Sequence, residues 1–229
     1  MSSRLDKAST AYSMEISTEK TKLMANNTSG INTEIKVNGQ KLETVTSFKY
    51  LGSVIPDEGS KPEMRSRIAQ TTAALTRLKP VWNDRSISLS CKIRLMRFLV
   101  TFIFLCVCES WTLTAELQRR MQAMEMRCYC EILRISYKHH VSNEEVRAKI
   151  QQAIGPHEDL LTIVQKRKLQ WYAHVSRSSG LVKTTLQGTV KEGRRPGRQK
   201  KRWEDRIRKW TGLEFAQSQR AVENRGKWL

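Results

Sequence analysis

The stretch FLVTFIFLCVC, residues 98–108, decides how the rest of the sequence folds, because it is the only long apolar run in the chain. Its eleven residues are too few to cross a bilayer, which takes about 20. Arg97 lies at its start and Glu109 follows it directly. We therefore expect a buried helix rather than a membrane anchor. It should run from about Ser88 to Val107 and be apolar nearly all round in its second half.

Capping signals and apolar spacing predict further helices on both sides of this run. Ser60-Lys-Pro-Glu63 and Ser142-Asn-Glu-Glu145 both have the Ser-x-x-Glu pattern of a capping box. Apolar residues follow each box at the three- and four-residue steps of one helix face. The expected helices run from the Ser60 box to Pro80, from Thr114 through Ile132, from the Ser142 box to Gly155-Pro156, over about 157–176, and over about 203–210 and 215–225.

Strand signals are confined to the first quarter of the chain. Asn38-Gly39 is a turn dipeptide between short apolar segments, which predicts a β-hairpin. The segment 48–55 then reads as one further strand, bent at Gly52. Everything after Pro56 reads as helical. The predicted fold class is mainly α with a small N-terminal β element.

Charge is the strongest global signal. The 229 residues carry 41 Lys and Arg against 22 Asp and Glu, a net charge of +19. Such an excess favours a polyanionic partner, most often nucleic acid; a merely soluble basic protein is the alternative. The N-terminal MSSRLDKAST lacks the features of a secretory leader, and the five cysteines are odd in number. We expect an intracellular protein, nuclear or cytoplasmic, without a membrane partner.

The densest group of cations lies near the C-terminus, in KEGRRPGRQKKRW (191–203) and EDRIRKW (204–210). In a helix, Trp203, Ile207 and Trp210 share one face and the cations share the neighbouring face. We expect this helix to dock through its apolar side and to present its cations to phosphates, after a linker at about 178–199. The candidate nucleic-acid-binding residues in this segment are Arg194, Arg195, Arg198, Lys200, Lys201, Arg202, Arg206 and Lys209.

The sequence offers no catalytic or metal-binding constellation. Two-metal phosphoryl transfer needs clustered carboxylates, and no Asp-Asp pair occurs in the chain. Cys128 and Cys130 with His139 and His140 invite a zinc interpretation, but their spacing is not that of a zinc finger. Bystander thiols are the favoured interpretation. We expect no catalytic residue, no metal, no cofactor and no small-molecule substrate.

Several stretches, in order, resemble the reverse transcriptase of non-LTR (LINE) retrotransposons, of the RTE and craniofacial-development-protein-2-like type. The resemblance covers nearly all of the chain after about residue 14. The stretches are EKTKLM (19–24), FKYLGSVI (48–55), CESWTLTAELQRRMQAMEMRCYCEILRISY (108–137), VSNEEVRAKI (141–150), KRKLQWYAHVSR (166–177), GRRPGRQKKRWEDRIRKWTGL (193–213) and ENRGKWL (223–229).

The resemblance implies a division into the edge of a polymerase palm (1–56), a helical thumb-like region (57–140) and a basic C-terminal region (141–229). It implies that Lys20 matches a lysine near the incoming triphosphate and that FKYLGS is a hairpin supporting the primer end. The family's catalytic aspartates would lie before EKTKLM and are not in this sequence. CVCESW also departs from the family, because Cys106-Val107 stand where Tyr-Gly is expected.

The expected function is therefore that of a truncated reverse-transcriptase fragment that binds RNA or DNA backbones without polymerising. Three alternatives stay open. The chain could be the thumb and tail of an active RNA-directed DNA polymerase whose N-terminal part is missing from the sequence. It could be a protein-interaction module that does not bind nucleic acid. It could also be an unselected product that folds poorly.

Overall fold

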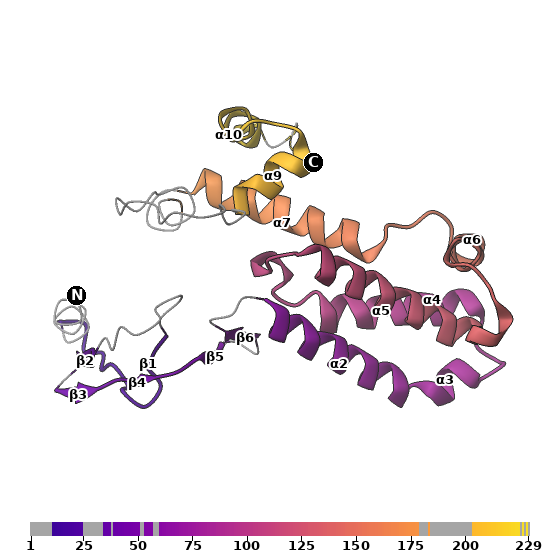
Figure 1. Cartoon of the computed structure of the whole chain (residues 1–229), viewed down its shortest axis with the longest axis horizontal. Helices are drawn as coiled ribbons and strands as arrows, with labels where there is room; N and C mark the ends of the chain where they lie inside the picture. The colour runs from indigo at the N-terminus through magenta and orange to yellow at the C-terminus, as the bar shows by residue number, and fades with distance from the viewer. Residues whose placement is uncertain are drawn as a thin grey trace. The chain divides into compact units, whose positions relative to one another are not determined.

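The structure is a computed structural model that describes residues 11–24, 34–37, 39–50, 53–56, 60–178, 183, 203–224, 226 and 228. The chain divides into two compact units, residues 1–67 and residues 68–229. The first contains every strand of the described residues and the second contains most of the helices (Figure 1). The fold is thus mainly α with a small N-terminal β element, as the sequence predicts.

The first unit contains three two-stranded pairings. Strand β2 (Lys36–Val37) pairs antiparallel with β3 (Gln40–Lys41), on either side of the predicted Asn38-Gly39 turn. Gly39 has a φ of +75°, a conformation that glycine adopts without strain. Strand β1 (Lys22–Leu23), within EKTKLM, pairs in parallel with β4 (Glu43–Thr44).

The expectation of one bent strand over residues 48–55 is wrong. Strand β5 (Ser47–Tyr50) turns back, and β6 (Ser53–Pro56) pairs with it antiparallel, with Phe48 opposite Ile55. The pairing of Tyr50 with Ser53 shows that the chain reverses completely where only a bend was expected, because each strand satisfies the backbone groups of the other. A hairpin at this place is what the resemblance implied.

Ten helices and 3-10 turns of the described residues follow; the longer ones lie close to the predicted bounds, and the three shortest were not predicted. They are α2 (Lys61–Arg77), α3 (Lys79–Asn83), α4 (Leu89–Phe104), η1 (Cys108–Ser110), α5 (Ala115–Leu133), η2 (Tyr137–His139), α6 (Asn143–Ile154), α7 (Leu160–Arg177), α9 (Trp203–Thr211) and α10 (Phe215–Glu223), of which η2 is a single turn joining α5 to α6.

Side-chain caps explain where these helices begin. Thr114 Oγ1 accepts a hydrogen bond from the amide of Leu117, and Ser142 Oγ accepts one from the amide of Glu145. Asp159 caps α7 in the same way through Thr162, which delays the start of this helix from the predicted residue 157 to residue 160. Each cap satisfies an amide that the first turn leaves without an intrahelical partner.

The helices of the second unit pack around α4, α5 and α7. Helix α4 contacts α5 and α6, and α5 contacts α6 and α7 (Figure 1). Phe104 and Trp111 meet edge to face, with ring centroids 5.2 Å apart, and both are buried. Helices α6 and α7 therefore pack on helices that precede residue 140, across the boundary that the resemblance implied.

One expectation about α4 is wrong. Its second half was predicted to be buried all round, but Phe98 is 65% exposed and Phe102 is 76% exposed. The buried residues Ile93, Met96 and Val100 face the neighbouring helices. Among the described helices of its unit, α4 thus packs on its neighbours through one side. Within the part of the chain that the structure describes, no helix is both long and apolar enough to cross a membrane.

Candidate nucleic-acid interface

The C-terminal helices dock on α7 through an apolar cluster. Helix α10 contacts both α7 and α9. Trp228 Nε1 donates to the Leu169 carbonyl oxygen over 3.2 Å, which holds the C-terminal segment on α7. Trp210 packs against the cluster from its edge. The buried members of this C-terminal cluster are Leu169, Tyr172, Ala173, Ile207, Val222 and Trp228.

This arrangement confirms part of what was predicted for the helix at 203–210. Ile207 is buried and Trp210 is partly buried against the C-terminal cluster, so the helix docks through its apolar side. Lys209 is exposed, as expected for a cation that contacts phosphate. Arg206 does not point freely outward: it is half-buried, and burial lowers the pKa of its guanidinium.

Most of the candidate binding residues lie outside the part of the chain that the structure describes. Arg194, Arg195, Arg198, Lys200, Lys201 and Arg202 lie outside the described residues, as does nearly all of the expected linker at 178–199. Lys20 is exposed and lies in the first unit, in the turn before β1. Arg206 and Lys209 lie in the second unit.

Behind Arg206 lies Lys168 of α7, which is fully buried. Its ammonium donates to the carbonyl oxygens of Glu109, at 2.5 Å, and of Trp111, at 2.7 Å. Burial, together with the smaller effect of the positive charge of Arg206, lowers the pKa of Lys168 to about 8. This lysine ties α7 to η1. It also joins two of the stretches that carried the resemblance, KRKLQW and CESW.

Lys168 was missed by sequence reasoning, although the sequence contained a signal. It lies four residues after Val164 and four before Tyr172, and both of these are buried. A lysine at a position on the apolar stripe of a helix is rarely buried without partners. The spacing could therefore have identified Lys168 as a structural cation. It could not have identified the carbonyl groups that this lysine binds.

Lys168 belongs to a wider set of cations that bind backbone carbonyl oxygens in other segments of the second unit. Arg97, for example, reaches the Glu158 carbonyl over 3.0 Å, and Arg177 reaches that of Val222 over 2.9 Å. We call this set the carbonyl-tethering cations; its members are Lys92, Arg97, Arg134, Arg167, Lys168 and Arg177. These cations therefore stabilise the tertiary structure.

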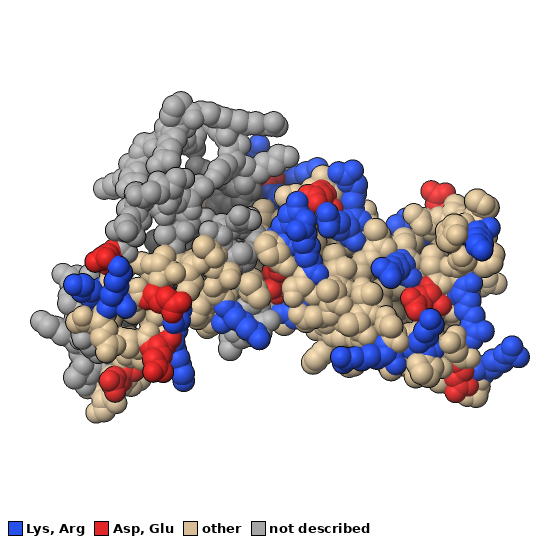
Figure 2. Space-filling model, turned by 60° about the horizontal axis from the view of Figure 1, so that its bottom comes forward, with Lys and Arg blue, Asp and Glu red and all other residues tan. Residues whose placement is uncertain are grey.

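Other cations of the second unit are exposed and make no ion pair among the described residues. Figure 2 shows Lys and Arg side chains spread over the helical part of one face, where Asp and Glu side chains are fewer. Exposed cations with high-dielectric surroundings can exchange small counterions for phosphates. Among them are Arg77, Lys79, Arg94, Arg127, Lys138 and Lys149.

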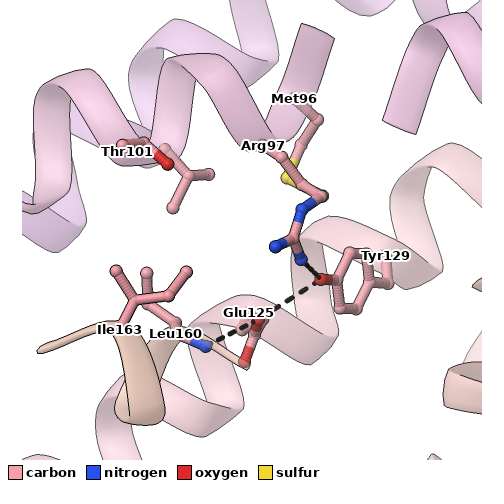
Figure 3. Close-up of a pocket in the computed structure, with 8 residues that line it drawn as sticks. Met96, Arg97, Thr101, Glu125, Tyr129, Leu160 and Ile163 are labelled. Atoms are coloured by element: carbon pink, nitrogen blue, oxygen red, sulfur yellow. Dashed lines mark hydrogen bonds between the residues drawn. The ribbon is translucent and has the colours of Figure 1, made fainter. Parts of the chain in front are cut away.

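A second buried polar group lies between α4, α5 and α7 (Figure 3). Glu125 Oε1 accepts hydrogen bonds from the Leu160 amide, at 3.0 Å, and from the Tyr129 hydroxyl, at 3.2 Å. Arg97 donates to the same hydroxyl over 3.0 Å. Glu125 Oε2 is buried and has no hydrogen-bond partner among the described residues, and burial raises the pKa of this carboxyl group. The adjoining cavity of about 20 Å³ has room for about one water molecule, which is too small for a nucleotide.

Cys128 and His139, two of the residues considered for zinc, make contacts within the fold. Cys128 is buried beside Met124, and burial raises the pKa of its thiol to about 12, so it stays protonated at neutral pH. His139 Nδ1 accepts a hydrogen bond from the Ser136 amide and caps η2. Within the described ranges, no three His, Cys, Asp or Glu side chains are grouped so that they could hold a metal ion.

Comparison with known proteins adds no relative. No protein-family profile, no curated protein and no solved structure matches this chain.

Proposed function

We propose that this chain binds the phosphate backbone of RNA or DNA and that it descends from the C-terminal part of a non-LTR reverse transcriptase, from the edge of the palm through the thumb and tail. The observation that carries the proposal is the surplus of exposed cations on a folded helical unit. Besides the carbonyl-tethering cations and the ion-paired cations, several helices carry further exposed lysines and arginines.

The sequence stretches that carry the resemblance support the proposed descent through their packing. The buried Lys168 of KRKLQW bonds to the carbonyls of CESW, and the helix that begins at WEDRIRKW docks on α7. These stretches lie far apart in the sequence and fold into one unit. We propose binding rather than catalysis for this chain, since two-metal phosphoryl transfer would need carboxylates grouped around the metal ions.

A salt titration tests the proposal. The affinity of the full chain for a fluorescein-labelled single-stranded RNA should fall steeply between about 50 and 200 mM salt, because each neutralised phosphate releases counterions. Replacing Arg198, Lys201 and Arg202 together by glutamate should flatten the slope of log K against log salt by about 2, at about 0.7 per contact.

The matched control reverses three exposed cations of the first unit, Lys36, Lys49 and Arg65, and so changes the net charge equally. We expect this control to keep most of the salt slope. Equal losses in both triple variants would show that net charge, rather than the basic segment, controls binding. Absent or salt-insensitive RNA binding by the wild type would refute the proposed function and favour a protein-interaction module.

A further inference from the structure

Helix α4 presents a stripe of three exposed residues at four-residue steps, Arg94, Phe98 and Phe102. The phenylalanines are 65% and 76% exposed. Their rings lie 6.2 Å apart between centroids and are tilted by only 20°, so they form a nearly parallel pair. Single exposed apolar residues are ordinary on protein surfaces, whereas adjoining ones mark interaction sites.

The stripe is not part of the core. The buried residues of α4 include Ile93, Met96, Val100 and Phe104, which lie on the opposite side of the helix. That side contacts α5 and α6. At about 100° per residue, Phe98 points nearly opposite to Val100. Folding of the second unit therefore does not explain why this face carries two aromatic rings.

We propose that Phe98 and Phe102 are a stacking platform for the bases of a single-stranded polynucleotide, with Arg94 placed to contact a phosphate beside them. This inference rests on the proposed function. Exposed aromatic rings accept any base because every base has a π face. Arg94 lies one helical turn before Phe98, so a cation and two rings follow one line along the helix.

Charge favours this occupant over a second copy of the chain. Each copy carries a net charge of +19, which opposes association of two copies. Arg94 adds another positive charge next to the rings. It makes no ion pair with any of the described residues. A polyanion with exposed aromatic bases complements both features together.

The variant Phe98→Leu/Phe102→Leu tests the platform in the full chain. Leucine keeps an apolar side chain and a high helix propensity, so the helix should persist; far-UV circular dichroism checks this. We expect the affinity for a labelled single-stranded RNA to fall about tenfold or more. The salt slope should stay unchanged, since no cation is removed. Tyr137→Leu, which alters a ring that is 86% exposed outside α4, is the control and should bind like the wild type.

A blunt duplex of the same length is the second probe, because its bases are already stacked and paired. The double leucine variant should bind this duplex within about twofold of the wild type. Single-strand affinity within twofold of the wild type would overturn the platform while leaving the proposed function standing. An equal loss on duplex and single strand would also overturn it, because the rings would then not read bases. Absence of RNA binding in the wild type would refute both proposals.

Discussion

The substitution Lys168→Met tests whether the buried lysine holds α7 against η1. The ammonium is fully buried and donates to two carbonyl oxygens, of Glu109 and Trp111. Methionine has a similar volume but donates no hydrogen bond, so both carbonyls lose a donor inside the protein. Each such loss costs about 1–3 kcal/mol. Removal of a buried charge offsets part of the sum, and we expect the variant to lose about 2–4 kcal/mol at neutral pH.

The pH dependence of this loss gives a second, independent test. Burial lowers the pKa of Lys168 from 10.5 to about 8 in the folded chain. Below about pH 8 the amine is protonated in both states. Between the two pKa values the unfolded chain binds one proton more, so the free energy of unfolding rises by about 1.4 kcal/mol per pH unit. The neutral amine still donates to both carbonyls. The gap between wild type and variant should widen by about 2 kcal/mol from pH 7 to about pH 9.5.

Urea unfolding followed by tryptophan fluorescence measures both quantities. The control is Lys166→Met, which removes an exposed lysine of the same helix that pairs with Glu158; it should cost less than about 1 kcal/mol at either pH. A Lys168→Met variant within about 0.5 kcal/mol of the wild type at neutral pH would refute the tethering role. A gap of the same size at both pH values would refute the lowered pKa.

Two further substitutions test the other buried groups. Burial raises the pKa of Glu125 above 4.5, so the folded chain holds the extra proton and loses stability as pH rises through that window. The urea stability of Glu125→Gln relative to the wild type should therefore improve from about pH 4.5 to about pH 7.5, whereas the exposed Glu131→Gln should show no such trend. Trp228→Ala should cost about 3 kcal/mol and speed amide hydrogen exchange in α9 and α10, while Trp171→Ala, at a side chain that is 36% exposed, should do neither; an unchanged exchange pattern in Trp228→Ala would contradict the role of the C-terminal cluster.

Helix positions could be predicted from the sequence because their signals are local. Thr114 and Ser142 cap the helices that follow them through bonds only three residues long. The exposure of Phe98 and Phe102 could not be predicted in the same way. An apolar sequence shows which side chains can be buried, whereas burial depends on how many neighbouring elements the fold supplies. Helix α4 has neighbours on one side within its unit.

In the candidate interface, too, the features with local sequence signals were predictable and those that depend on tertiary contacts were not. The apolar spacing of Ile207 and Trp210 correctly predicted that α9 docks through that face. The half-buried position of Arg206 was not predictable, because it depends on how α9 packs in the tertiary structure. Lys168 itself bonds to a carbonyl 57 residues earlier in the chain. Such a contact exists only once the tertiary structure has formed.

The two uses of positive charge in this chain can be separated by experiment. A carbonyl-tethering cation such as Lys168 or Arg177 donates to the backbone of a distant segment, so its loss should lower stability first and affect RNA only through the fold. An exposed cation such as Lys149 makes no such bond among the described residues, so its loss should leave stability nearly unchanged. The net charge of +19 therefore overstates what a polyanion can contact. Since the salt slope counts the cations that neutralise phosphates, it should be set by members of the exposed group and stay well below the total charge.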